Sequence, residues 1–144
     1  MYTHIMFHVR STSTNMHESD LPRICAYVSG IINNLNGIPI AVNGITDHIH
    51  ILATLPKTIS LSQFVRTIKT ESTMWLKRTF EYYDKFSWQD GYGAFSVSAS
   101  NLDRTKNYVM NQAEHHKKIS FYDEYKKIAD AYEIEYDEKY AFAD

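Results

Sequence analysis

The sequence has one cysteine and no long apolar run, and each scarcity excludes a class of protein. Cys25 is the only thiol among 144 residues, so an internal disulfide is excluded and a small buried residue in a reducing cytoplasm is expected. No stretch approaches the ~18 apolar residues of a membrane span, and the first residues lack the pattern of a secretory signal. A glycine-rich phosphate loop is also missing, so no ATP site is expected. We therefore expect a cytoplasmic protein without a membrane segment.

Overall positive charge is missing too. The net charge of −2 argues mildly against a nucleic-acid partner. Residues 117–144 contain five lysines and eight acidic residues, a net charge of −3, whereas residues 1–116 carry a net charge of +1. Any affinity for DNA must therefore come from a local patch of the chain rather than from its total charge.

The length and composition are those of one globular domain. With 44% hydrophobic and 22% charged residues, the chain can build a single core. We predict one domain over residues 1–144, with a core of about 1–116 and an acidic tail, 117–144, that is helical and peripheral. Eleven tyrosines are present, so a functional tyrosine has to be identified by its context.

Hydrophobic periodicity predicts the order β-α-β-β-α-β followed by a further helix. The expected strands are Tyr2–Val9, Pro39–Ile45, His48–Leu55 and Ala94–Ala99. The expected helices run from the caps Ser19 and Asp20 to Gly37, from the capping box Ser60–Gln63 to about Phe80, and from Asn101 to His116 behind the caps Ser100 and Asp103. This order predicts an α+β, ferredoxin-like split βαβ fold, an antiparallel sheet with helices on one face.

A His-x-His pair begins the third predicted strand. His48 and His50 project from the same face of the strand, while Ile49 faces the other way. Two neighbouring imidazoles are half of a metal site, although such a pair alone is more often two polar residues on a solvated sheet. Asp47 either orients an imidazole or serves the preceding turn, and both interpretations stay open.

The last core helix has two distinct sides. Polar groups lie within about 80° of one another on one side, which comprises Arg104, Tyr108, Gln112 and His115. An apolar stripe roughly 100° away comprises Leu102, Val109 and Ala113. The helix can therefore pack through one stripe and present a hydroxyl, an amide and a guanidinium on the other. An ordinary amphipathic helix with a solvated polar side would give the same pattern.

A basic row marks the long helix before the fourth strand. Its members are Arg66, Lys69, Thr73 and Lys77. Such a row can hold a phosphate backbone, and Trp88 and Tyr92 in the following aromatic loop could stack on unpaired bases. Because charged helical rows are usually plain solvent faces, the row supports DNA binding only together with other features.

Three segments together resemble the small single-tyrosine HUH transposases of bacterial insertion sequences, a group within the HUH endonuclease superfamily that includes the REP-associated tyrosine transposases. HUH denotes His-hydrophobe-His. The matching segments are residues 44–52 (GITDHIHIL), 88–96 (WQDGYGAFS) and 108–112 (YVMNQ). They occur in the family's order and approximate spacing, and the likeness extends from the first strand to about His116. Three linked motifs are far more specific than any one of them.

The resemblance implies a DNA transposase that cleaves and rejoins single-stranded DNA. His48 and His50 would ligate a divalent metal, Mg²⁺ or Mn²⁺, with Gln112 as a third ligand. Tyr108 would be the nucleophile and would form a 5′-phosphotyrosine. The implied partners are single-stranded DNA with hairpin ends and a second copy of the chain, in a homodimer whose tyrosine helix acts on its own or the other subunit. The expected DNA contacts are Arg66, Lys69, Lys77, Trp88, Tyr92 and Arg104.

Other functions stay open at this level. The first is a non-catalytic single-strand-binding domain, although the third strand offers His48 and His50 where such domains usually carry stacking aromatics. The second is a domesticated enzyme that processes genomic repeats and no longer moves. The third is a metallohydrolase in which the histidines and a carboxylate activate water, which would make Tyr108 dispensable.

Overall fold

A four-stranded antiparallel sheet forms the centre of the protein. The structure, a computed structural model, describes residues 1–112 and 120–131. The strand order in the sheet is β2-β3-β1-β4. The strands are β1 (Tyr2–His8), β2 (Ile38–Ile45), β3 (His48–Thr54) and β4 (Gly93–Val97). The predicted α+β class with an antiparallel split βαβ sheet is therefore confirmed.

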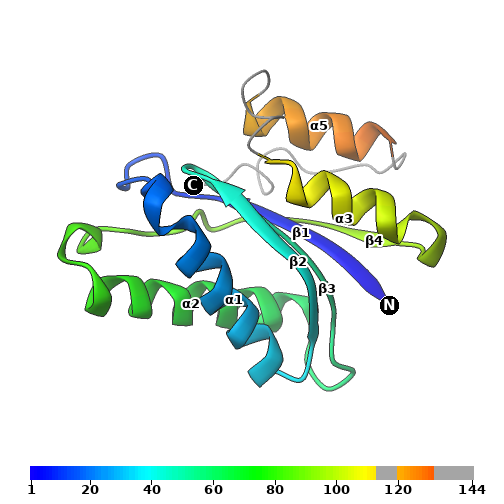
Figure 1. Cartoon of the computed structure of the whole chain (residues 1–144), viewed down its shortest axis with the longest axis horizontal. Helices are drawn as coiled ribbons and strands as arrows, with labels where there is room; N and C mark the ends of the chain where they lie inside the picture. Colours follow the sequence, from blue (N-terminus) through cyan, green and yellow to red (C-terminus); the bar gives the residue numbers. More distant parts are fainter. Residues whose placement is uncertain (113–119, 132–144) are drawn as a thin grey trace.

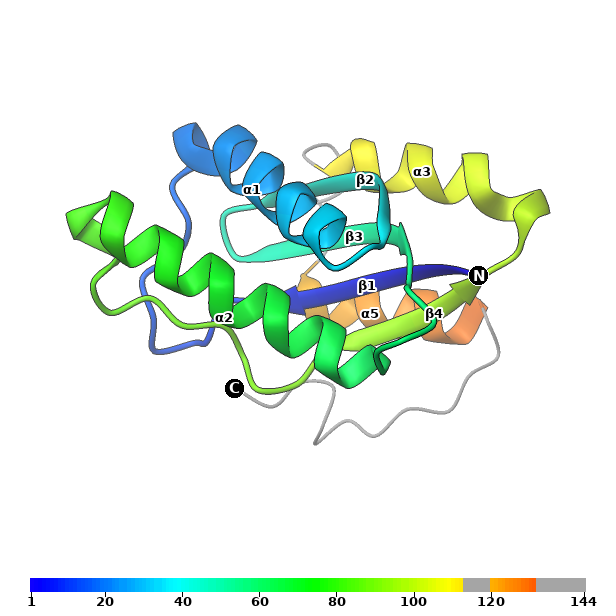
Figure 2. The same ribbon diagram turned by 90° about the horizontal axis from the view of Figure 1, so that it is seen from below.

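Helices cover both faces of this sheet, as Figures 1 and 2 show. The helices are α1 (Leu21–Asn34), α2 (Leu61–Thr79), α3 (Leu102–Met110) and α5 (Phe121–Ala131). Short 3₁₀ turns span Glu18–Asp20, Glu81–Tyr83 and Ala99–Asn101. The helices α1 and α2 lie on one face, as predicted, whereas α3 and α5 cover the other face, which was predicted to be open. None of these described helices is long and apolar enough to cross a membrane.

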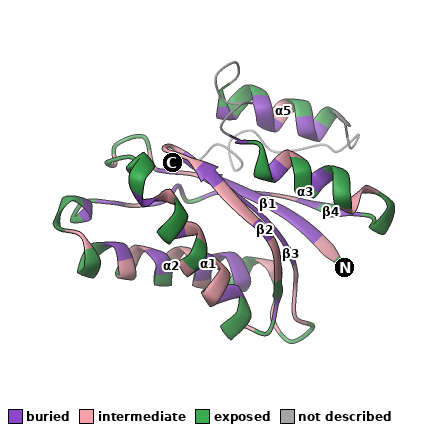
Figure 3. Ribbon diagram, viewed as in Figure 1, coloured by how far each residue is buried: buried purple, intermediate pink, exposed green. Residues whose placement is uncertain are grey.

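Strand alternation divides the side chains of the two central strands between these layers. Ile5 and Phe7 of β1, with Ile49 and Ile51 of β3, pack into the core under α1 and α2. The residues between them, including Met6 and the two histidines of β3, face α3 and α5. Both central strands are buried along most of their length, so β1 is purple over most of its course in Figure 3. The sheet therefore separates an apolar core from a layer that contains the histidines.

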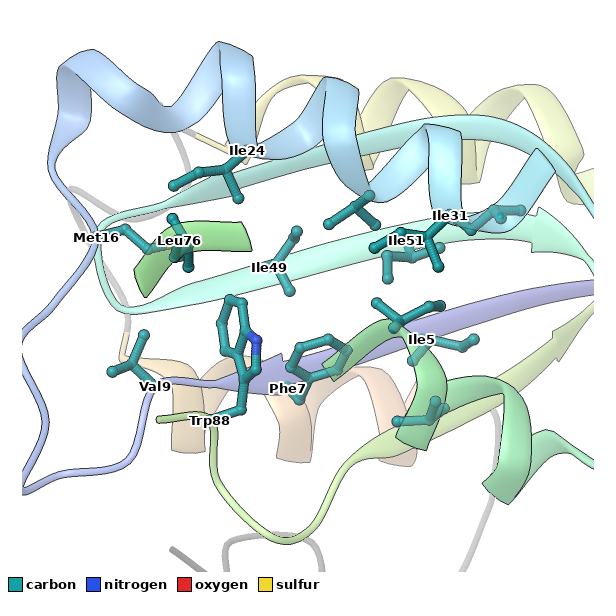
Figure 4. Packing of buried hydrophobic residues seen from close by; sticks show 14 of the residues in the cluster. Ile5, Phe7, Val9, Met16, Ile24, Ile31, Ile49, Ile51, Leu76 and Trp88 are labelled. Atoms are coloured by element: carbon teal, nitrogen blue, oxygen red, sulfur yellow. The ribbon is translucent and has the colours of Figure 1, made fainter. Parts of the chain in front are cut away.

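Trp88 belongs to the apolar core, where Figure 4 shows it beside Phe7. Its side chain is 4% exposed and its ring centroid lies 4.9 Å from that of Phe7, edge to face. The indole N–H donates to Ser72 Oγ over 3.0 Å. With its ring enclosed, Trp88 is not available in this structure to stack on a base as the sequence suggested.

Two of the three predicted helix caps are wrong. Ser60 accepts a hydrogen bond from the backbone N–H of Gln63 over 3.1 Å, as predicted for α2. The Asp20 side chain makes no capping hydrogen bond to α1. Its carboxylate instead accepts hydrogen bonds from the hydroxyl groups of Tyr82 and Tyr83. The α3 helix begins after Asn101 without a side-chain cap, so the capping roles expected of Ser100 and Asp103 are not seen.

Gly37 ends the connection from α1 to β2, as predicted. The preceding Asn36 has a φ of 66°, and the backbone N–H of Gly37 donates to Ile32 O over 3.0 Å. A Cβ atom on Gly37 would lie 2.7 Å from Thr54 O. Only glycine therefore allows the chain to enter β2 this close to β3.

The tail was expected to be peripheral, and for residues 120–131 this expectation is wrong. Phe121, Tyr125 and Ile128 of α5 are buried against Met6 and Phe95 of the sheet. Residues 121–131 are helical as predicted, and their apolar side covers the sheet face that carries the histidines. Residues 113–116, the expected end of the preceding helix, and residues 132–144 lie outside the described part. The division into a core of 1–116 and a tail stays a prediction.

The Asp20 cluster allows a test of the fold. We expect Asp20→Ala to lower the free energy of unfolding by about 2 kcal/mol, because the hydroxyl of fully buried Tyr83 loses its acceptor. Tyr82→Phe is the matched control, since Tyr82 is 43% exposed and water can replace its bond. Urea denaturation measures both variants. Equal free energies of unfolding for Asp20→Ala and Tyr82→Phe would show that the bond from Tyr83 to Asp20 contributes nothing to stability.

Candidate active site

Two buried imidazoles lie side by side on β3. His48 and His50 are both 0% exposed, and their ring centroids are 5.3 Å apart. Their Nε2 atoms lie 3.2 Å and 3.0 Å from the same oxygen, Oε1 of Glu124 on α5. The sequence-predicted pair is therefore not solvated. It faces a carboxylate from the end of the chain.

Hydrogen bonds at Nδ1 fix the direction of each imidazole. Asp47 Oδ1 lies 2.7 Å from His48 Nδ1, and His4 Nε2 lies 2.8 Å from His50 Nδ1. With Nδ1 held in this way, each ring turns its Nε2 atom toward Glu124. His4 comes from β1, the neighbouring strand, where no motif in the sequence points to it.

The electrostatics of the histidines differ. Burial, and then the nearby His50, lower the pKa of His4 to about 3, so His4 is neutral. Burial alone would lower the pKa of His48, but hydrogen bonds to Asp47 and Glu124, with the charges of both carboxylates, raise it overall. The two carboxylates thus stabilise positive charge near His48; a metal ion bound there would replace the proton at Nε2, because only the neutral imidazole can act as a ligand.

Glu124 was missed by sequence analysis because it lies in the tail that was expected to be peripheral. Its carboxylate is 0% exposed and contacts both imidazoles. A signal was present in the sequence. Phe121, Tyr125 and Ile128 recur at helical spacing, and Glu124 lies on the same side of the helix, so it is a charged residue on a stripe that has to be buried.

The three donors fit a divalent metal ion. One ligand atom each of His48, His50 and Glu124 lies within 4.8 Å of the others. Adjacent ligands of an octahedral ion with bonds of ~2.1 Å lie about 3 Å apart, which is close to the separations seen at the Glu124 oxygen. Imidazole and carboxylate together suit Mn²⁺ and related ions, and the donor set alone does not fix which ion binds.

Tyr108 of α3 reaches the same carboxylate. Its hydroxyl donates to Glu124 Oε2, and its ring centroid is 5.9 Å from that of His50. Burial, followed by the hydrogen bond and charge of Glu124, raises the pKa of Tyr108 well above its usual value. The phenol and the imidazole pair therefore meet within one subunit.

Asn43 ties the end of the tyrosine helix to the sheet, and Gln112 bonds within that helix end. Gln112 is 0% exposed, and its Nε2 donates to the backbone oxygen of Tyr108 over 3.1 Å. Asn43 of β2 donates to the backbone oxygens of Val109 and Met110 at the end of α3. The apolar stripe of the helix packs as predicted through Leu102 and Val109. His115 and Ala113, which were placed on the two sides of this helix, lie outside the described residues.

The basic row lies on the opposite layer of the molecule. Arg66, Lys69 and Thr73 line a cavity of about 480 Å³ with Tyr92, whereas Lys77 is not among its lining residues. The Lys69 ammonium donates to the backbone oxygens of Gln89 and Gly91, and burial lowers its pKa to about 8. Lys69 therefore holds the aromatic loop together.

A second cavity lies beside the tyrosine. Arg104, the remaining predicted DNA contact, lines a space of about 300 Å³ together with Tyr108 and His4. Of the predicted site residues, the structure thus brings His48, His50 and Tyr108 to one buried carboxylate. Asp47 bonds His48, and Gln112 bonds the backbone of Tyr108. The basic row stays apart from them.

The family model for IS200-like transposases matches residues 1–112. The chain belongs to this family. No curated protein matches this transposase.

Two solved structures resemble this transposase in fold. One is a candidate transposase from Deinococcus radiodurans R1, with a TM-score of 0.59, 14% identity, and coverage of 78% of this chain and 90% of that one. The other is a REP-associated tyrosine transposase bound to a REP hairpin, with a TM-score of 0.57, 14% identity, and coverage of 79% and 67%. At this identity the likeness concerns the fold alone.

The hydrogen bond to His48 gives a test of metal binding. We expect Asp47→Ala to weaken Mn²⁺ binding by about 10–100-fold, because the imidazole loses the partner that directs its Nε2 atom. Titration of free Mn²⁺ by electron paramagnetic resonance measures the affinity. His17→Ala, which removes an exposed histidine stacked on Tyr82, is the control. Unchanged affinity in Asp47→Ala would contradict the orienting role.

Proposed function

We propose that this IS200-like transposase cleaves and rejoins single-stranded DNA through a covalent tyrosine intermediate. The observation that supports this function is the meeting of three groups at Glu124. Its Oε1 faces the Nε2 atoms of His48 and His50, and its Oε2 accepts the hydroxyl of Tyr108. A nucleophile and a set of metal donors thus share one buried carboxylate.

The histidines hold the metal in this proposal, and Asp47 and His4 keep their Nε2 atoms directed at it. When bound, the metal neutralises the non-bridging oxygens of a phosphodiester and lowers the barrier to attack on its phosphorus. The family resemblance implies Gln112 as a third ligand, whereas the geometry favours Glu124, whose oxygen already lies between the imidazoles. Mg²⁺ and Mn²⁺ are both compatible with these donors.

Tyr108 acts as the nucleophile. Its Oη atom forms a bond to phosphorus while the bond from phosphorus to the 3′-oxygen breaks, which leaves a 5′-phosphotyrosine and a free 3′-OH. The phenolic proton passes to Glu124 Oε2, the atom to which the hydroxyl already donates, and from there through solvent to the departing 3′-oxygen, which becomes the free 3′-OH. The 3′-OH of a second strand reverses the step and restores the phenol. Bond energy is retained throughout, so no ATP is needed.

The DNA partner is proposed to be a single strand with hairpin ends. A structurally similar REP-associated transposase is bound to such a hairpin, which supports this class of substrate. We also propose a homodimer. Tyr108 does not require a partner subunit to reach the histidines, because its ring centroid lies 5.9 Å from the ring centroid of His50 in the same chain.

A metallohydrolase is the second candidate. Two histidines and one carboxylate at a single centre are donors that also suit an enzyme that activates water. The two functions differ in what they require of Tyr108, which a hydrolase would not need. The position of its hydroxyl against Glu124 supports the transposase.

The nucleophile assignment is tested by Tyr108→Phe. We expect wild-type protein with Mn²⁺ to form a denaturation-resistant adduct with single-stranded DNA from the element's end, and the variant to form none while still binding the DNA. Gel electrophoresis under denaturing conditions measures the adduct. Tyr82→Phe, at an exposed tyrosine on the other layer, should behave as wild type. An adduct in Tyr108→Phe would refute the assignment, and metal-dependent cleavage without an adduct would favour the hydrolase.

The role of Glu124 is tested by Glu124→Gln. The amide keeps an oxygen for the metal but cannot accept the phenolic proton at its nitrogen. We therefore expect retained Mn²⁺ binding and a rate of adduct formation reduced by about 10²–10⁴-fold. Asp123→Asn, at an exposed neighbour on α5, is the control. A wild-type rate in Glu124→Gln would rule out the proton-acceptor role, and lost Mn²⁺ binding would show that the metal needs the full charge.

A further inference from the structure

The cavity beside Tyr108 lies between α3 and α5, the two helices that share one face of the sheet in Figure 1. Arg104 and Thr105 come from α3, and Lys127 comes from α5. Tyr108 and His4 also line it, so the space adjoins the proposed nucleophile directly. Its volume is about 300 Å³.

The two cations of this cavity are free to meet an anion. Arg104 and Lys127 are both exposed, and within residues 1–112 and 120–131 neither makes an ion pair or a hydrogen bond. This distinguishes them from Lys69, whose ammonium is occupied by backbone oxygens. The carboxylate of the nearby Glu124 does not neutralise them, because it is buried and engaged by the imidazoles and the phenol.

The size of the cavity limits what can enter. A volume near 300 Å³ is at the small end of ligand pockets, which suits one nucleotide and excludes a duplex. The walls combine cations with apolar and amide groups. Buried Ile128 offers a surface for the flat face of a base, and the Asn101 side chain offers a donor and an acceptor for its edge.

We propose that this cavity binds the single nucleotide adjoining the phosphate that Tyr108 attacks, with Arg104 and Lys127 contacting its backbone phosphate. The assignment deepens the proposed function and rests on it. It gives α5 a second role, since Lys127 on its exposed side contacts the strand while Glu124 on its buried side serves the reacting centre. It also assigns DNA contact to a lysine of the acidic segment, where net charge argues against it.

The test measures non-covalent binding in the Tyr108→Phe background, where no adduct can form. The probe is a fluorescent thymidine oligonucleotide, and anisotropy gives its affinity at several salt concentrations. We expect Arg104→Gln and Lys127→Gln each to weaken binding severalfold and to reduce the slope of log K against log salt by about 0.7, the value for one phosphate contact with a single strand. Lys127→Arg should retain both affinity and slope.

Lys106→Gln is the matched control, because Lys106 is exposed on α3 and does not line the cavity. Equal losses in Lys106→Gln and the two cavity variants would overturn the proposal, since the effect would then reflect total charge. An absence of binding by the parent would overturn it as well. Cation-dependent binding in the Tyr108→Phe background, together with no adduct in the protein that retains Tyr108, would uphold the subsite and refute the covalent mechanism separately.

Discussion

The buried carboxylate of Glu124 is the interaction on which the candidate site depends. A carboxylate removed from water is costly unless its oxygens find charge or hydrogen bonds, and here both oxygens are used. One lies between the Nε2 atoms of His48 and His50, and the other accepts the phenol of Tyr108. Side chains from β3 and α3 are therefore tied to one carboxylate on α5, and the removal of Glu124 would take away a partner from all three of them at once.

The sheet makes this arrangement possible by separating two kinds of burial. On one face, alternating isoleucines and Phe7 form an apolar core that needs no polar partner. On the other face, His4, His48 and His50 are equally buried but polar, so each needs a hydrogen bond. His4 and His50 bond to each other, and Asp47 and Glu124 supply the other bonds. The apolar core on the first face thus stabilises the sheet that carries the polar cluster.

Much of the fold could be predicted because periodicity reports burial directly. The alternation in 48–54 and the capping serine at Ser60 each have local causes, and the structure agrees with both. The failures concern residues whose partners are distant in sequence. Asp20 looked like a helix cap and instead accepts two hydroxyls from residues more than sixty positions away. Composition alone could not show that Trp88 would be enclosed by Phe7 and Phe86.

The candidate site was predicted in part for the same reason. His48 and His50 are neighbours on one strand, and Tyr108 and Gln112 are neighbours on one helix, so each pair could be recognised locally. Spacing cannot show which residue joins the pairs. His4 had no motif around it, and Glu124 lay in a segment whose acidity suggested a solvated tail. Its apolar stripe was the stronger signal, because a helix buries the side that its hydrophobic residues define, whatever its net charge.

The acidity of the tail therefore has a different meaning from the one that net charge suggests. A total of −2 would normally count against a nucleic-acid partner. A centre that binds a cation and then a phosphate needs negative charge at the metal and positive charge where the strand lies, within a few ångströms of each other. In the proposed mechanism the helix α5 supplies both charges, since Glu124 faces the imidazoles and Lys127 lines the cavity beside Tyr108. For such an enzyme, the position of each charge relative to the site matters more than the net charge. The net charge of the whole chain does not contain that information.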